Sequence, residues 1–547
     1  MRRAAVLDNV TDLAAPARSF AVSCRHTERV TVLDTTLRDG AQGANVSFSV
    51  ADKLHVARVL DRFGVSYIEA GTPASNPKDE EFFRAARALK LGKAKLCAFG
   101  STRRKDVAPA ADPGLRALLA AATPVVSIFG KAWDWHVTEI LRTSLAENLR
   151  MIGDSVRYLR RHGKEVLFDA EHFFDGYAAN PDYAFAVVAA AAEAGAACVC
   201  LCDTNGGALP TPVFNAVRAA VEKFPGVRFG IHTHNDSGCA VANALVALEA
   251  GVTLVQGTFT GVGERCGNAD LAAIVAGASL KKRRDCDGDL SQLCATAAEI
   301  AEIANLMIPG NAPYIGQDAF AHKAGMHVDG VLKSPATFEH VAPEAVGNHR
   351  RFLVSEIAGR RQVMEKIKAL APGLRKDAPE LRAILARLKE LESYGYQYEA
   401  ADASFELMVR KIIGKYRKRF TLVFYKTIGE FPHPGDEMPA SAIVKVEVGG
   451  KTEMAAASGN GPVNALDGAF RKALSAFYPE IAAVRLTDYK VRVLEENAAT
   501  AAKVRVLIEH ADGVRTWNTV GVSSDIIEAS MTALTDAVEY KLALDGI

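Results

Sequence analysis

The sequence predicts an α/β protein that begins with a closed parallel (β/α)8 barrel, or TIM barrel. From residue 30 onward, β-rich runs alternate with segments of helical length, and there are eight such runs. Several runs end in polar, charged or glycine-rich sequence, and in this fold the chemistry lies at the C-terminal ends of the strands. The eight runs span residues 30–33, 67–71, 95–100, 124–130, 166–171, 198–204, 227–235 and 254–261.

The segments between these runs have apolar residues at helical spacing, as over 51–63 and 138–161. After about residue 283 the pattern changes, and residues 361–393 read as charged amphipathic helices broken by Pro372 and Pro379. We therefore expect a barrel followed by a helical linker region.

The C-terminal part reads as a small α+β module. Strands over 443–448 and 452–457 lead through Gly459-Asn-Gly-Pro-Val463 into a helix that ends at Phe477. Strands over 484–494, 504–509 and 516–522 then lead into a second helix over 524–544. This weak internal repeat of three strands and a helix is typical of a dimerising or ligand-sensing domain.

The chain therefore divides into four expected parts. They are an N-terminal extension (1–28), a catalytic barrel (29–283), linker subdomains (284–435) and a C-terminal regulatory or dimerisation domain (436–547).

Composition sets further expectations. The 547 residues are 49% hydrophobic and 24% charged with a net charge of +1, so nothing indicates nucleic acid or an anionic membrane as a partner. No uncharged apolar run reaches the ~18 residues of a membrane span, and residues 1–28 lack the apolar core of a secretory signal. The nine scattered cysteines fit a reducing, cytoplasmic location.

Cys198, Cys200 and Cys202 alternate within one apolar run. A metal cluster is one interpretation of this spacing. A buried strand with small side chains is the favoured one.

A metal site is expected at the mouth of the barrel. His232 and His234 lie two residues apart at the end of a strand, so their imidazoles point to the same face. Asp39 follows strand one, which is next to strand eight and close to strand seven in a closed barrel. Mixed nitrogen and oxygen ligands suit Mg²⁺, Mn²⁺, Zn²⁺ or Co²⁺. Two histidines hydrogen-bonding within a loop are the alternative.

Arg38 directly precedes Asp39. A metal and a neighbouring guanidinium together form a clamp for a 2-oxo acid, because both stabilise the developing alkoxide. A structural salt bridge is the alternative for this arginine. Glu171 and Thr204 end strands five and six, and polar groups that point into such a mouth are more suited to substrate than to packing.

Three ordered motifs stand at the ends of strands one, seven and eight. They are Leu33-Asp-Thr-Thr-Leu-Arg-Asp-Gly-Ala-Gln42, His232-Thr-His-Asn-Asp236 and Gly261-Val-Gly-Glu-Arg-Cys-Gly-Asn268. They resemble the signatures of the metal-dependent family that contains the isopropylmalate, homocitrate and citramalate synthases, the lyase of hydroxymethylglutaryl-CoA and the carboxyltransferase domain of pyruvate carboxylase. The Glu264-Arg265 pair favours a synthase over a lyase.

Four further stretches, over 75–79, 129–136, 169–176 and 201–207, are similar to the citramalate branch of this family. Ala41, where isopropylmalate synthases usually carry glutamate, also favours this branch. The resemblance implies an acyltransferase that condenses acetyl-CoA with pyruvate and water to (R)-citramalate and CoA, in isoleucine biosynthesis.

The resemblance also implies residue roles. Asp39, His232 and His234 are expected to bind the divalent metal, with the amide oxygen of Asn268 as fourth ligand. A regulatory C-terminal domain implies isoleucine as effector. The turn at Gly459–Val463 would suit its carboxylate, although a plain helix start explains that turn almost as well.

The same resemblance implies catalytic roles for Arg38, Glu171 and His327. Arg38 would act on the oxo group, and Glu171 would orient water or a proton near the metal. His327 lies in a Gly-Met-His-Val-Asp-Gly run similar to a linker motif that reaches the neighbouring subunit's site, so we expect a homodimer with shared sites and His327 as the base. Asp169 and Thr204 are expected to bind substrate together with Arg38, with Thr204 donating to its carboxylate.

Two alternatives remain. The same condensation on 2-oxoisovalerate would make the chain a 2-isopropylmalate synthase in leucine biosynthesis, whereas 2-oxoglutarate would need a further cation that the sequence does not identify. A non-catalytic amino-acid sensor is less favoured, because such a protein should have lost metal ligands and all four positions are filled.

Overall fold

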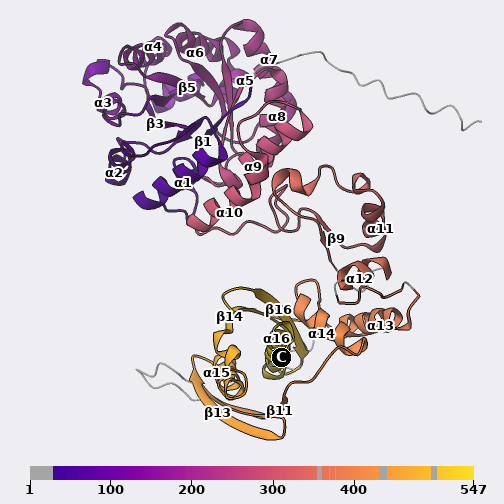
Figure 1. Cartoon of the computed structure of the whole chain (residues 1–547). Coiled ribbons are helices and arrows are strands. Elements are labelled where there is room, and N and C mark those ends of the chain that lie inside the picture. Colours follow the sequence, from indigo (N-terminus) through magenta and orange to yellow (C-terminus); the bar gives the residue numbers. More distant parts are fainter. Residues whose placement is uncertain (1–28, 354–359, 369, 376, 430–439, 495–501) are drawn as a thin grey trace, which may run out of the picture. The chain divides into compact units, whose positions relative to one another are not determined.

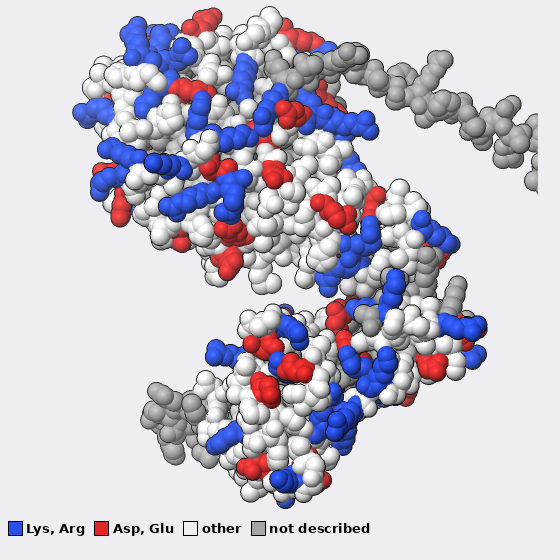
Figure 2. Space-filling model, in the orientation of Figure 1, with Lys and Arg blue, Asp and Glu red and all other residues white. Residues whose placement is uncertain are grey.

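The computed structural model describes residues 29–353, 360–368, 370–375, 377–429, 440–494 and 502–547, so the extension expected over 1–28 lies outside it. Two compact units divide these residues. The first holds 29–319 and 341–349, and the second holds 320–340 and the described residues from 350 onward. Within the described residues, no helix combines the length and apolar character that crossing a membrane requires. Acidic and basic side chains are both spread over the face of each unit seen in Figure 2.

The first unit is the predicted barrel. Eight parallel strands follow one another in chain order, and β1 closes the ring by pairing with both β2 and β8. The labelled strands β1, β3 and β5 lie among the helices of this unit in Figure 1. The strands are β1 (Thr31–Asp34), β2 (Tyr67–Glu69), β3 (Lys95–Ser101), β4 (Val125–Lys131), β5 (Glu165–Glu171), β6 (Cys198–Asp203), β7 (Phe229–Thr233) and β8 (Leu254–Gly257).

Inside the barrel, an apolar layer lies below a polar one. One side chain from nearly every strand forms the lower layer, including Tyr67, Leu167 and Leu254. Because inward-facing residues recur every second position, the next inward residues are Glu69, Asp169 and Gln256. The strands therefore carry apolar contacts at one level and polar groups at the next level toward the mouth.

Helices surround the barrel and largely match the periodicity of the sequence. α1 begins at a capping box in which Ser49 and Asp52 bond each other's backbone, and it ends at Gly64, whose φ of 97° is left-handed. The helices of this unit are α1 (Val50–Phe63), α2 (Pro77–Ala86), α3 (Pro113–Ala120), α4 (Leu145–Arg161), α5 (Phe173–Ala179), α6 (Pro181–Glu193), α7 (Pro210–Lys223), α8 (Ala240–Ala250), α9 (Leu271–Ala276) and α10 (Leu293–Ile303).

The predicted helix over 138–161 is shorter in the structure. A π-helical turn covers His136–Ile140, and Arg142 has a left-handed φ of 50°. Ser144 then caps the helix proper by accepting a hydrogen bond from the Glu147 amide. Apolar spacing alone did not reveal this break.

The strand interpretation of Cys198, Cys200 and Cys202 is confirmed. All six residues of β6 are buried. Sulfur atoms of Cys200 and Cys202 also lie within 4.8 Å of an Asp169 oxygen, but the hydroxyl of Ser127 and the amide of Gln256 already donate to that carboxylate.

The second unit begins with short elements and helices. Pro372 and Pro379 separate helices as predicted, because α12 ends before the first and α13 starts at the second. The elements are β9 (Ala321–His322), α11 (Gly325–Lys333), β10 (Arg351–Phe352), α12 (Arg360–Ile367), α13 (Pro379–Tyr394) and α14 (Asp402–Ile412).

Two β-β-β-α repeats complete the second unit, so the predicted internal repeat is confirmed. The first strand of the first repeat, β11, was not predicted, although its sequence is rich in β-branched and aromatic residues that favour a strand; all nine of its residues are at least partly exposed. The repeats comprise β11 (Thr421–Gly429), β12 (Ala440–Val448), β13 (Lys451–Gly459) and α15 (Pro462–Ser475), then β14 (Arg485–Val493), β15 (Val504–Ala511), β16 (Thr516–Ser523) and α16 (Ile526–Leu544).

A buried histidine in the second repeat should make this unit sensitive to acid. His510 is 2% exposed and stacks on Trp517. Burial lowers its pKa from 6.5 to about 4, with Asp467 opposing and Arg471 adding to the shift. Because the unfolded chain takes up the proton first, the free energy of unfolding should fall by up to about 3 kcal/mol as pH drops from about 6.5 to 4.

Scanning calorimetry between pH 4.5 and 7.5 measures this effect. His510→Phe removes the titrating group and keeps a ring against Trp517, so its unfolding temperature should depend less on pH. An equal pH dependence in both proteins would show that other groups cause it.

Candidate active site

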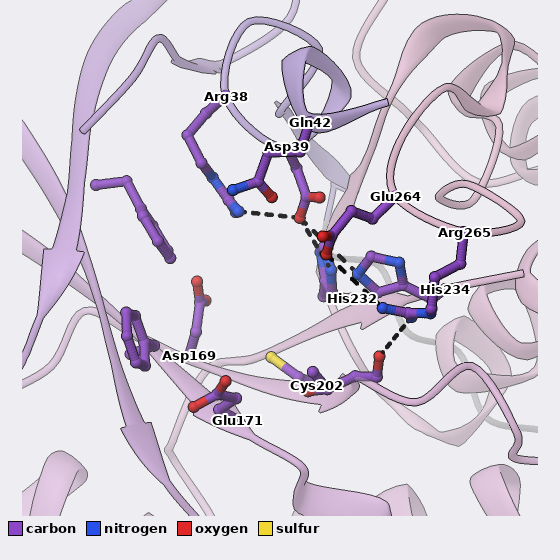
Figure 3. A pocket seen from close by; sticks show the side chains of 13 residues that line it. Arg38, Asp39, Gln42, Asp169, Glu171, Cys202, His232, His234, Glu264 and Arg265 are labelled. Carbon is purple, nitrogen blue, oxygen red and sulfur yellow. Dashed lines mark hydrogen bonds and ion pairs between the residues drawn. The ribbon is translucent and has the colours of Figure 1, made fainter. Parts of the chain in front are cut away.

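A cavity of about 200 Å³ opens at the C-terminal mouth of the barrel (Figure 3). Every one of its lining residues comes from a strand end or the loop that follows it. They are Arg38, Asp39, Gln42, Phe99, Phe129, Asp169, Glu171, Cys202, Thr204, His232, His234, Glu264 and Arg265.

Asp39, His232 and His234 converge in this mouth as a group that can hold a metal ion. The Nε2 atoms of the two histidines lie 3.6 Å and 3.9 Å from Asp39 Oδ2. All three side chains are buried, and one ligand atom from each lies within 4.8 Å of the others. The spacing of two residues in β7 and the adjacency of β1 and β8 produce this convergence, as the sequence predicted.

The charges of this group suit a divalent cation. Burial alone would raise the pKa of Asp39. The charges of Arg38 and the two histidines outweigh burial and lower this pKa, so the carboxylate stays ionised. Burial lowers the pKa of His232 to about 3 and also lowers the pKa of His234. An ionised carboxylate and neutral imidazoles are the forms that bind metals.

Asn268 adds a fourth donor, an amide oxygen, beside this group. Its backbone bridges that of His234, and its Nδ2 donates to the carbonyl of Val262 at 3.2 Å. The buried Oδ1 has no hydrogen-bond partner among the described residues, which fits a metal-facing oxygen. With two imidazoles, a carboxylate and this amide oxygen, the donor set fits a divalent metal.

Glycines make room for this arrangement. A Cβ on Gly263 would lie 2.2 Å from Asn268 Nδ2, and one on Gly267 would lie 2.0 Å from the carbonyl oxygen of Gly261. Gly267 also has a left-handed φ of 90°. The glycine spacing of the third motif therefore shapes the loop that presents Asn268.

Arg38 is held from three sides. Its Nε donates to Glu69 Oε2 at 2.6 Å, its Nη1 lies 3.0 Å from Asp39 Oδ2, and its guanidinium lies over the Phe99 ring at 3.8 Å. Burial alone would lower the pKa of Arg38, but the two carboxylates raise it. The cation is therefore permanent and fixed in orientation.

Glu69 was missed by the sequence analysis. It is fully buried, and burial raises its pKa to about 7 although the Arg38 charge opposes this. A signal was present, since an acid two residues after Tyr67 in an apolar strand must face the same side as Tyr67. If that side is the barrel interior, the carboxylate needs a cation.

The predicted substrate residues lie at the floor and wall of the cavity. Asp169 accepts hydrogen bonds from Ser127 and Gln256, and burial raises its pKa. Glu171 pairs with Lys131 at 2.5 Å. The hydroxyl oxygen of Thr204 accepts the backbone N–H of His172 at 2.9 Å, which leaves the hydroxyl hydrogen as the group it can offer a ligand.

His327 belongs to α11 in the second unit, where its ring stacks on Phe338 at 4.2 Å. The structure therefore groups all the other predicted site residues at the barrel mouth, and the role of His327 stays a prediction.

Comparisons with known proteins agree with this geometry. The HMGL-like family matches residues 29–300, a homocitrate synthase post-HMGL domain-like family matches 314–395, and the LeuA allosteric (dimerisation) domain matches 399–542. The (R)-citramalate synthase of Aquifex aeolicus is 49% identical over 95% of this chain and 98% of its own length.

A second (R)-citramalate synthase is equally similar to this chain, whereas a 2-isopropylmalate synthase has lower sequence identity. The (R)-citramalate synthase of Geobacter sulfurreducens is 49% identical over 94% of this chain and 97% of its own length. A probable 2-isopropylmalate synthase of Methanosarcina mazei covers 95% of this chain and 96% of its own length, but at 30% identity. The chain belongs to the (R)-citramalate synthase family.

Proposed function

We propose that this protein is an (R)-citramalate synthase that condenses acetyl-CoA with pyruvate and water to (R)-citramalate and CoA. The observation that carries the proposal is the metal-binding group beside the fixed guanidinium of Arg38, in a chain 49% identical to named (R)-citramalate synthases along nearly its whole length. Such a pair suits a 2-oxo acid, because its neutral oxo oxygen and its anionic carboxylate both offer lone pairs to cations.

The cavity wall favours a small oxo acid. The rings of Phe99 and Phe129 stack at 5.5 Å and line the mouth beside Arg38. A methyl group fits against such a wall more easily than the isopropyl group of 2-oxoisovalerate. The other lining cation, Arg265, is engaged by Asp236 at 2.8 Å, so the described lining residues offer no obvious cation for the second carboxylate of 2-oxoglutarate.

Asp39, His232, His234 and Asn268 would hold the metal, which when bound supplies a Lewis acid for the oxo group. Mg²⁺, Mn²⁺, Zn²⁺ and Co²⁺ all suit the donors. Arg38 donates to the oxo oxygen and stabilises the alkoxide that forms there. Thr204 donates to the substrate carboxylate, and Asp169 supports the cavity floor beneath it.

The remaining steps move protons and cleave the thioester. A base takes a proton from the methyl group of acetyl-CoA, and the resulting carbanion attacks the ketone carbon of pyruvate. The alkoxide gains a proton, and water oriented by Glu171 attacks the thioester carbonyl, so that CoA leaves as the thiol. We assign the base to His327 of a partner subunit in a homodimer, and the matching LeuA allosteric (dimerisation) domain supports the dimer that this role requires.

We further propose that this enzyme acts in the cytoplasm and serves isoleucine biosynthesis. Its four parts would follow the boundaries expected above, except that β11, which pairs with β12, belongs with the regulatory part.

Product identification tests the proposed reaction. The protein is incubated with acetyl-CoA and one oxo acid at a time: pyruvate, 2-oxoisovalerate or 2-oxoglutarate. The rate of thiol release is measured, and the product is then identified by chiral chromatography. We expect pyruvate to give (R)-citramalate with a kcat/KM at least about 10-fold above that for 2-oxoisovalerate, as a pocket that discriminates two methyl groups allows. A preference for 2-oxoisovalerate would instead identify a 2-isopropylmalate synthase.

Feedback control is the regulatory part of the proposal. L-isoleucine should slow thiol release from acetyl-CoA and pyruvate by the full chain, whereas L-alanine at the same concentration should not. A rate unchanged by L-isoleucine would refute the effector assignment and leave the reaction untouched.

A further inference from the structure

Two neighbouring loops at the barrel mouth carry Glu171 and Thr204, and both side chains line the active-site cavity. Glu171 ends β5 and Thr204 directly follows β6, and these two strands pair in parallel. In the reaction proposed above, Thr204 holds the substrate carboxylate and Glu171 orients water. The distance between the two side chains must therefore match the substrate, and the residue after each of them takes part in a link between the two loops.

Three side chains form this link. His172 Nδ1 lies 3.0 Å from Asp175 Oδ2, and Asn205 Nδ2 donates to the same oxygen, also at 3.0 Å. Burial would raise the pKa of Asp175, but the hydrogen bonds from His172 and Asn205 lower it, so the carboxylate stays ionised. Because an ionised carboxylate only accepts hydrogen bonds, Nδ1 of His172 carries a hydrogen. One oxygen of Asp175 thus joins the loop after β5 to the loop after β6.

The backbone of His172 makes a second connection between the loops. Its N–H donates to the hydroxyl oxygen of Thr204 at 2.9 Å. His172 has a left-handed φ of 58° and ψ of 35°, a conformation that is uncommon for residues with a Cβ and that persists where the surroundings enforce it. Its side chain is 9% exposed, and its ring centroid lies 4.1 Å from that of His136. The surroundings therefore hold His172 in the conformation that reaches Thr204.

The acceptor of the link is fixed by the helix that carries it. Asp175 lies in the first turn of α5, which is labelled in Figure 1. The next residue, Gly176, packs closely on the loop after β4, because a Cβ there would lie 2.3 Å from the carbonyl oxygen of Ala132. The N–H of Gly176 also donates to the carbonyl of His172 at 2.9 Å. Asp175 is therefore a fixed point to which both loops are tied.

We propose that His172, Asp175 and Asn205 are positioning residues that set the spacing of Glu171 and Thr204 for the oxo acid. None of the three is among the described residues that line the cavity, so they act through their neighbours and not on the substrate. The inference rests on the roles proposed above for Glu171 and Thr204, and it adds what holds these two side chains at a fixed separation.

Asn205→Ala tests the link at an exposed position, where truncation should leave the fold intact. Thr204 then loses one restraint, so the KM for pyruvate should rise about ten-fold, the size expected for one hydrogen bond to a charged group. The KM for acetyl-CoA should change by less than about two-fold, because neither loop residue binds it in the proposed reaction.

Two changes at Asp175 separate the link from a general effect of charge. Asp175→Ala removes the acceptor from both loops, so it should raise the KM for pyruvate and also lower kcat, since Glu171 is released as well. Asp175→Asn keeps an oxygen that can accept both hydrogen bonds and should retain most of the activity. If Asp175→Asn were as impaired as Asp175→Ala, the charge and not the link would be responsible.

Asn180→Ala is the matched control. Asn180 also donates from Nδ2 to a carboxylate, that of Asp134 at 2.7 Å, and its own oxygen caps α6. Its loss should lower the unfolding temperature at least as much as Asn205→Ala does, without a change in the KM for pyruvate. An unchanged KM in Asn205→Ala, or an equal rise in Asn180→Ala, would overturn the inference.

Pyruvate binding gives a readout that does not depend on turnover. In calorimetric titrations of the Mn²⁺-loaded protein, Asn205→Ala should bind pyruvate about ten-fold more weakly than the unaltered chain, and equal affinity would again overturn the inference. If the unaltered chain releases thiol only with another oxo acid, all measurements are made with that acid. A wrong substrate in the proposed function is therefore distinguishable from a failed link.

Discussion

Asp39→Ala and His234→Ala should each lower the rate of thiol release from acetyl-CoA and pyruvate by about 10³-fold or more. Each change removes one donor from a group of three whose ligand atoms lie within 4.8 Å of one another. Loss of the metal removes several kcal/mol of transition-state stabilisation, and each 1.4 kcal/mol corresponds to ten-fold in rate. The same variants should bind Mn²⁺ at least ten-fold more weakly in calorimetric titrations of metal-free protein.

His162→Ala is the matched control for this experiment. His162 is an exposed histidine at the C-terminal end of α4 and contacts only Tyr158 among the described rings. This variant should keep both activity and Mn²⁺ affinity. Near-normal activity in Asp39→Ala or His234→Ala would refute the metal-binding assignment, and normal circular dichroism would exclude misfolding as the cause of a loss.

Glu69→Gln should lower kcat/KM for pyruvate by about 10²-fold. Glu69 is a positioning residue, because it contacts Arg38 Nε at 2.6 Å and does not line the cavity. When residue 69 has lost its negative charge, Asp39 is the main remaining partner of Arg38. The guanidinium then turns from the oxo group toward the metal-binding carboxylate. Truncating one charge of a buried pair costs about 2–5 kcal/mol, which sets the size of the effect.

Two measurements separate this role from a general loss of stability. The KM for acetyl-CoA should change far less than the kinetic constants for pyruvate, since Arg38 contacts only the oxo acid in the proposed reaction. Glu165→Gln makes the same change at the start of β5, where the acid pairs with Lys95 and Tyr67 away from the mouth. If this control lowered kcat/KM for pyruvate as much, the positioning role of Glu69 would be refuted.

The barrel and most of its mouth were predictable from the sequence because both follow from strand register. His232 and His234 share a face by their spacing, and ring closure brings Asp39 to them. Glu69 was missed because its role as the partner of Arg38 depends on which face of β2 points into the barrel. The three residues of that strand are all buried. Hydropathy therefore does not distinguish its two faces.

Loops and exposed strands were harder to predict for a different reason. The break before α4 depends on a single left-handed residue, Arg142, which leaves no trace in apolar periodicity. β11 pairs with β12 alone among the described strands and none of its nine residues is buried, although its Leu, Val, Phe, Tyr and Ile favour a strand.

The layered interior of the barrel divides each strand between two tasks. Tyr67 and Glu69 are neighbours on one face of β2, as are Leu167 and Asp169 on β5, yet the lower member of each pair packs in an apolar layer and the upper member meets a charge or a hydrogen-bond donor. Sequence change at the lower positions is therefore constrained by volume, and at the upper positions by charge. New substrate preferences can evolve at the mouth of this barrel while the packing that keeps it folded stays intact.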